Sequence, residues 1–250
     1  MVRESLARRF HPAGFEQPEG SRKSYVKPRR ELQDAFDKWI GELGNDAYFK
    51  RPVLYQKAQK LIEPLGKIPY MEANSLLVDF KPKNSSQMDA GLFVSACHNQ
   101  SPEQVIVFDL DAPKIDCIGY KFGEKRVLIN NGNIGNMVGD LSSGLVVLNG
   151  KSDGYYGSYV LGTLIRMQYP ENYAVLSKEC QVLWPSNCER IPELKKYMGD
   201  LKDATKAIKD EESTKRFIER YGVGGEKIVP EIIEALKREA STHNRMKYWL

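Results

Sequence analysis

The chain has 250 residues, of which 41% are hydrophobic and 28% charged, a composition typical of a globular protein with one large domain or two small ones. No apolar run approaches the roughly 20 residues of a membrane-spanning helix, and the N-terminal segment lacks the apolar stretch of a secretory signal, so we expect a cytoplasmic protein with no membrane partner. The net charge of +4 is uneven: residues 1–30 are strongly basic, whereas residues 31–192 are slightly acidic and therefore a poor candidate for a nucleic-acid surface.

Residues 1–29 are predicted to form a basic, flexible arm. They contain several arginines, three prolines and little periodic apolar content, so we expect an extended chain that a partner or the body of the protein orders. In "RKSYVKPRR" (22–30) basic residues alternate with a tyrosine, a pattern that also suits nucleic acid. The candidate nucleic-acid contacts are Arg22, Lys23, Tyr25, Lys27, Arg29 and Arg30. A tail docked on protein is the alternative for the same residues.

Residues 30–70 are predicted to form a helical hairpin. Apolar residues from Leu32 to Leu43 recur every three or four positions, which predicts a first helix over about 30–43. A second helix begins near Pro52, because proline suits the first helical position, and ends near Gly66. The two apolar stripes would pack on each other or on the body, and they need no ligand to explain them.

Residues 75–190 are predicted to form the core. Eight short apolar runs separated by turn residues each indicate a strand. The runs are "SLLVDF", "GLFVSA", "EQVIVFDL", "KIDCIGY", "KRVLIN", "GLVVLN", "GTLIRM" and "CQVLW". Residues 191–250 return to a helical pattern and are predicted to form a C-terminal cap, with a helix at 193–210 as its lid. The order of helices, strands and helices predicts an α+β fold and argues against alternating β-α units.

The glycine-rich segment 132–162 belongs to a sequence repeat with a constant period. A shift of 18 in residue number superposes "VLI" (127–129) on "LVV" (145–147), then on "TLI" (163–165) and on "QVL" (181–183). A fixed period with strands and turns in phase is typical of a repeat architecture. We therefore predict a short β-helix or β-solenoid core flanked by helices at both ends, with glycines at corners where φ is positive or backbones approach closely. The predicted corner glycines are Gly132, Gly135, Gly139, Gly144, Gly150, Gly154, Gly157 and Gly162.

A phosphate-binding loop does not explain the same glycines. A dinucleotide-binding turn needs G-x-G-x-x-G before a helix, whereas the spacing here is G-x-x-G-x-x-x-G and the strand "LVVLN" follows Gly144. The letters "GKS" at 150–152 match the end of a Walker loop, but its upstream glycine is missing. The sequence predicts no cofactor.

The segment "INNGNIGNMVGDLSSGLVVLNGKSDGYYGSYVLGTLI" resembles the glycine repeat of the GXGXG domain. That domain closes the large subunit of glutamate synthase and also forms one of the subunits of formylmethanofuran dehydrogenase. The resemblance implies a right-handed β-helix that acts as a structural spacer for neighbouring domains or subunits. This chain departs from those families because it has few coils, places Gly154 one position late, and lacks the amidotransferase and flavin-binding portions, so neither activity carries over.

Candidate chemistry is sparse. Cys97 and His98, which follow the run "GLFVSA", have the residue types of a nucleophile–base pair. Adjacent residues on a strand point to opposite faces, however, so we expect a buried cysteine and a histidine at the surface. Asp109 and Asp111 have the spacing of a metal-binding carboxylate pair, but the same sequence pattern is typical of a strand that ends in an aspartate-capped turn. No CxxC pair is present, and the sequence predicts no metal site and no catalytic residue.

The sequence favours a non-catalytic structural or assembly protein that binds a protein partner or a second copy of itself. Tyr155, Tyr156 and Tyr159 are candidate partner contacts, or alternatively an aromatic ladder on one face of the coils. Two other functions stay open: a protein that binds nucleic acid through residues 1–30, and an enzyme similar to the β-helix acyltransferases, which have coils of similar length and a catalytic histidine.

Overall fold

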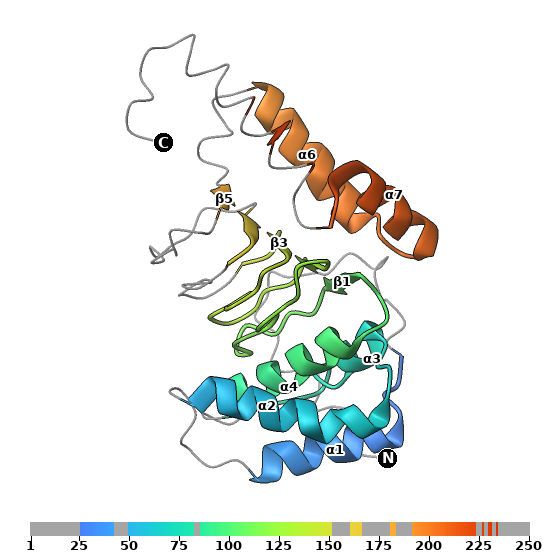
Figure 1. The fold of residues 1–250 in the computed structure, drawn as a ribbon, viewed down its shortest axis with the longest axis vertical. Helices are drawn as coiled ribbons and strands as arrows, with labels where there is room; N and C mark the ends of the chain where they lie inside the picture. The colour runs from blue at the N-terminus through green and yellow to red at the C-terminus, as the bar shows by residue number, and fades with distance from the viewer. Residues whose placement is uncertain are drawn as a thin grey trace, which may run out of the picture.

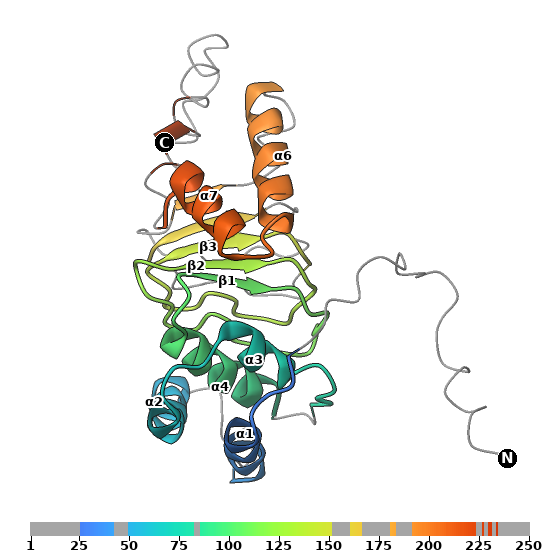
Figure 2. The ribbon, with the colours of Figure 1, turned by 90° about the vertical axis from the view of Figure 1, so that its right-hand side faces the viewer.

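The computed structural model of the protein describes residues 26–42, 50–82, 86–151, 161–166, 181–183 and 192–223, with single positions up to 234. The helices are α1 (Arg30–Glu42), α2 (Arg51–Ile62) with a 3-10 turn η2 (Glu63–Leu65), α3 (Tyr70–Ser75), α4 (Ser86–Gln100), α6 (Pro192–Lys206) and α7 (Glu211–Tyr221). The strands are β1 (Val105–Phe108), β2 (Val127–Asn130), β3 (Leu145–Leu148), β4 (Thr163–Arg166) and β5 (Gln181–Leu183). Figures 1 and 2 both show the sheet between α1–α4 on one side and α6–α7 on the other.

The helical hairpin predicted before residue 70 corresponds to α1 and α2. Leu32, Phe36 and Trp39 lie one turn apart on α1 and are buried, because this spacing puts them on one face. Pro52 stands in the first turn of α2, and Gly66, with a φ of 70°, follows η2.

None of the helices in the described part of the chain is long and apolar enough to cross a membrane.

The strands form one five-stranded sheet in the order β1-β2-β3-β4-β5, and every neighbouring pair is parallel. From β2 onward each strand pairs with the next at a constant offset of 18 in residue number, as in Val127 with Leu145 and Leu145 with Thr163. The predicted alignment of these strands is therefore confirmed. Between β1 and β2 the offset is 22, as in Val105 with Val127.

Strands β1, β2 and β3 are buried on both faces, which explains their continuous apolar runs. The even-numbered strand residues, such as Ile106, Leu128 and Val146, lie in a cluster with loop residues, such as Phe122, and with α1–α4. The odd-numbered residues of β1–β4 form a second cluster with α6 and α7, which we call the odd-face cluster. Its members include Val105, Val107, Val127, Ile129, Leu145, Val147, Ile165, Met198, Leu201, Phe217 and Tyr221.

The prediction of an α+β protein with a short β-helix or β-solenoid core is wrong. A β-helix needs a second or third parallel sheet along its coils, whereas the strands of the described residues form a single sheet. The architecture is a mixed α/β fold, in which one small parallel sheet is combined with six described helices. The connecting segments between strands also stack, with an isolated bridge between Ala112 and Ile134, but they extend into no further sheet within the described ranges.

Three of the eight predicted strands are absent for identifiable reasons. The run 91–96 lies inside α4, because a helix buried on all sides has the same continuous apolar pattern as a buried strand. Residues 75–80 include the end of α3 and a turn. Residues 114–120 form turns, where Cys117 and Gly119 have positive φ values of 63° and 77°.

Candidate functional site

The described glycines of the repeat lie where chain segments approach each other closely. A Cβ atom on Gly132 would overlap the backbone carbonyl of Leu110, and one on Gly150 would overlap the carbonyl of Gly132. The same holds for a Cβ on Gly162 against the carbonyl of Gly144. Equivalent backbone contacts surround Gly135 and Gly144. These glycines therefore permit the stacking of successive connections.

Gly139 has a different reason to be glycine, because its φ of 69° is in the left-handed region. The remaining predicted corners, Gly154 and Gly157, lie outside the described residues, as do Tyr155, Tyr156 and Tyr159.

Cys97 and His98 lie on α4, and both are buried with no exposed surface. The expectation of a surface histidine on a strand is therefore wrong. The Nε2 atom of His98 is 2.8 Å from Oδ1 of Asn74, whose Nδ2 donates to the carbonyl of Val107 at 2.8 Å. The histidine thus connects α4 to the first strand of the sheet through a side chain at the end of α3.

The surroundings of His98 keep its ring neutral. Burial, with a smaller contribution from the nearby Arg126, lowers the pKa of His98 to about 3. Its Nδ1 atom is buried and has no partner among the described residues. Burial also raises the pKa values of the Cys97 and Cys117 thiols. A nucleophilic cysteine needs a lowered thiol pKa, and a catalytic base needs access to substrate. The two cysteines and His98 meet neither condition, so they act as buried structural residues.

Asp109 and Asp111 follow β1, and the structure gives Asp111 a role within the fold. Oδ1 of Asp111 accepts a hydrogen bond from the backbone N–H of Asn133 at 3.0 Å, so this carboxylate caps the neighbouring connection. Within the part of the chain that the structure describes, no three His, Cys, Asp or Glu side chains are grouped to hold a metal ion.

The end of the basic arm is attached to the body of the protein through Arg29. Its backbone N–H donates to the carboxylate of Glu72 at 2.6 Å, and its guanidinium donates to the carbonyls of Leu65 and Lys67 at 3.2 and 2.7 Å. Lys27 and Arg30 are exposed, and Arg30 lies 3.7 Å from Asp34. Arg22, Lys23 and Tyr25 are outside the described residues. Of the described candidates, only the exposed pair could therefore face nucleic acid.

A buried ion pair joins the start of α2 to the connection between β2 and β3. Arg51 donates to Oδ2 of Asp140 at 2.7 Å, and the aspartate side chain is only 1% exposed. Burial raises the pKa of Asp140, an effect that Arg51 opposes. Beside this pair, the ammonium group of Lys121 lies about 6 Å from the ring centres of Tyr55 and Tyr120. Nothing in the sequence pattern pointed to this cluster, since its members are far apart in the chain.

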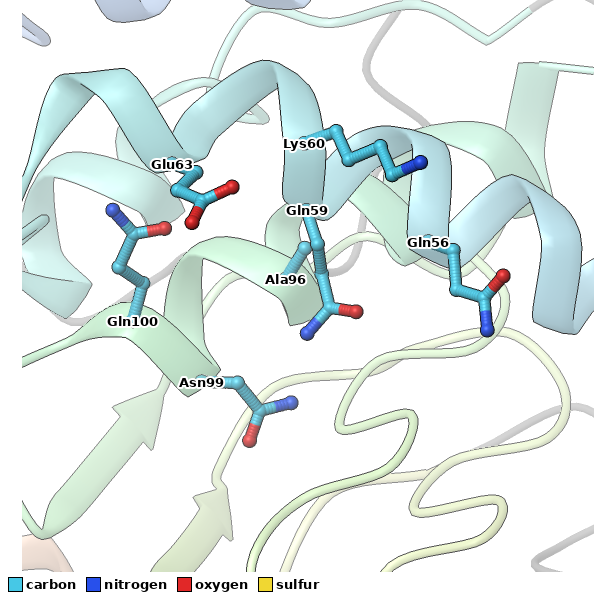
Figure 3. A pocket seen from close by; sticks show the side chains of 7 residues that line it. All are labelled: Gln56, Gln59, Lys60, Glu63, Ala96, Asn99 and Gln100. Carbon is cyan, nitrogen blue, oxygen red and sulfur yellow. The ribbon is translucent and has the colours of Figure 1, made fainter.

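A groove of about 480 Å³ lies between α4 on one side and α2 with η2 on the other. Figure 3 shows side chains from both helices around it. Its lining residues are Gln56, Gln59, Lys60, Glu63, Ala96, Asn99 and Gln100. The α2 residues repeat at intervals of three or four, which is ordinary for the solvent face of a helix, so sequence reasoning missed the groove.

Two carboxamides of the groove are held in place by the body of the protein. Nδ2 of Asn99 donates to the hydroxyl of Tyr55 at 2.7 Å, and to backbone carbonyls. Nε2 of Gln100 donates to the carbonyl of Ile62 at 3.2 Å and to that of Gly66. The groove therefore combines fixed amides with exposed ones, and no histidine, cysteine or hydroxyl nucleophile is among its described lining residues. Such a lining is suited to binding by hydrogen bonds.

Comparison of the chain with protein-family models, with curated proteins and with solved structures finds no match.

Proposed function

We propose that this protein is a non-catalytic structural or assembly protein that binds a protein partner or a second copy of itself. The observation that carries the proposal is the contrast between the two kinds of polar site described above. Of the residues that the structure describes, the one histidine, His98, and the two cysteines, Cys97 and Cys117, are buried and held inside the fold. The polar groups around the surface groove are amides and two opposite charges, which suit recognition.

The glycines of the repeat agree with a structural role, because those that are described allow chain segments to stack closely. A cytoplasmic location agrees with Cys97 and Cys117, which are free and buried, as is usual for proteins of a reducing compartment.

The test is affinity purification of the tagged full-length chain from its own cells at low and high salt, with light scattering of the purified protein. We expect either one or two proteins at a fixed ratio that persist at high salt, or a homo-oligomer of defined mass. A monomer that purifies alone would contradict the proposal. Co-purified nucleic acid that high salt releases, and that removal of residues 1–25 together with Lys27→Ala and Arg30→Ala abolishes, would favour nucleic-acid binding through the arm instead.

A further inference from the structure

The groove between α2 and α4 has a chemistry that narrows the kind of partner. Gln56, Gln59 and Gln100 each present a carboxamide, which carries a hydrogen-bond donor and an acceptor like the peptide group itself. Because Nδ2 of Asn99 and Nε2 of Gln100 are already engaged by the protein, their carbonyl oxygens remain as acceptors of fixed position. These groups match the main chain of a polypeptide.

The size of the groove fits a short extended segment. Gln56 on α2 and Glu63 at the start of η2 are seven residues apart, which corresponds to about 10 Å along the helix axis. An extended chain advances about 3.3 Å per residue, so about three residues of a ligand would lie along this wall. The buried Ala96 forms part of the lining between the two rows of polar side chains, and its small side chain leaves room for a backbone there.

Two opposite charges give the groove a direction. Lys60 near the end of α2 and Glu63 at the start of η2 are both exposed and line the same wall of the groove, three residues apart. In the described part of the chain neither side chain forms an ion pair, with the other or with a third residue. The carbonyl oxygen of Gln100 lies at the Glu63 end, as Figure 3 shows, and adds an acceptor there. A ligand therefore gains most from an acidic side chain at Lys60 and a basic one at Glu63.

We propose that this groove binds an extended segment of a protein partner in which an acidic and a basic residue stand no more than two positions apart. The acidic residue pairs with Lys60, the basic residue pairs with Glu63 and Gln100, and the carboxamides bind the main chain between them. The inference rests on the proposed function, because it names the kind of partner that the assembly role requires.

The first experiment selects binders to the full-length protein from a phage-displayed library of random peptides. We expect enriched peptides that carry the acid–base pair, and a synthetic peptide of that sequence whose affinity falls roughly tenfold with Lys60→Glu. Lys57→Glu is the matched control, since it makes the same charge change at an exposed position of the same helix outside the groove. The double variant K60E/E63K should instead prefer the peptide with its acid and base exchanged.

Absence of enriched peptides, equal loss of affinity with Lys57→Glu, or failure of the exchanged peptide to bind the double variant would overturn the inference. Thermal unfolding of the variants should match that of the wild type, because all three positions are exposed. Purification from cells separates the two proposals. If a partner co-purifies equally with wild type and K60E/E63K, the assembly role stands and the groove is not its site. If neither brings down a partner and both are monomers, the assembly role itself fails.

Discussion

At the scale of single residues, the polar side chains inside this protein hold segments together. His98, Asn74 and the carbonyl of Val107 form a hydrogen-bonded chain that joins three elements. Arg126 donates to the carbonyls of His98 and Ser101 at 2.9 and 2.8 Å and so closes the end of α4. A buried polar group without a partner is costly, so these contacts specify how the helices meet the sheet.

Asp89 is an exception with a measurable consequence. The residue is 2% exposed, its Oδ1 has no partner among the described residues, and burial raises its pKa from 3.8 to about 6. Above pH 6 the carboxylate is charged in both the folded and the unfolded chain, and this charge costs the folded state up to about 3 kcal/mol. Below pH 3.8 both states are protonated and the cost disappears.

We therefore expect Asp89→Asn to raise the free energy of unfolding at pH 8, by up to about 3 kcal/mol. The gain should shrink as the pH falls through 6 and vanish near pH 4. Urea unfolding of both proteins across this range measures the effect. A variant that is less stable than wild type at every pH would show that the carboxylate makes a stabilising contact.

The glycines allow a second test at a single position. Gly150→Ala should lower the free energy of unfolding by about 2 kcal/mol or more, because the added Cβ would overlap the carbonyl of Gly132. Gly199→Ala is the control: it lies on α6 with no atom within 4 Å of the added Cβ, and should stabilise by about 0.5–1 kcal/mol. Equal effects of the two changes would remove the close-approach argument.

At the scale of elements, the Arg51–Asp140 pair ties α2 to the connection between β2 and β3. Arg51→Ala leaves a buried carboxylate without its main partner, and should cost about 3–5 kcal/mol at pH 7. Because burial raises the pKa of Asp140, the carboxylate takes up a proton as the pH falls, so the cost should be smaller at pH 5.

Denaturant unfolding at the two pH values measures this dependence. Adding Asp140→Asn to Arg51→Ala should restore part of the loss, since the amide carries no charge. If Arg51→Ala costs the same at both pH values and in the double variant, the loss reflects packing of the arginine stem alone.

The elements that could be predicted from sequence are those with a distinctive period. The 3/4 spacing of Leu32, Phe36 and Trp39 indicated α1, and the constant shift of the repeat indicated β2–β5 in their observed register. The helix α4 could not be recognised, because it is surrounded by protein and its apolar residues show no one-sided stripe. The single-sheet architecture was missed for a related reason. The 18-residue period shows that one strand recurs in each repeat unit, but it does not show whether the rest of the unit forms a second strand or a loop.

The candidate site depended on contacts that no local pattern reveals. The groove exists because Gln100 and Asn99 of α4 are held against residues about 34 to 44 positions earlier in the chain. The buried position of His98 likewise follows from the packing of α4, where a strand would have exposed it.

At the scale of the whole molecule, the sheet is stable only with both of its faces covered. Leu201 of α6 has no exposed surface and lies in the odd-face cluster with Val127, Leu145 and other strand residues. Leu201→Ala should lower the free energy of unfolding by about 2–5 kcal/mol, because it leaves a cavity between α6 and the sheet.

Hydrogen exchange of the strand amides measures how far this loss spreads. We expect faster exchange in β2 and β3 as well as in α6, since they share one core. Faster exchange confined to α6 and α7 would show that these helices unfold separately from the sheet.

The constant register between β2 and β5 determines how this protein can change in length. A duplication of residues 131–148 would add one whole repeat unit, and the new strand would place its side chains on the same two faces as its neighbours. A single residue inserted within a strand would exchange the two faces downstream, whereas the larger offset between β1 and β2 shows that a connection accommodates extra residues. The gene can therefore lengthen by copying one unit, and each copy widens the sheet by one strand.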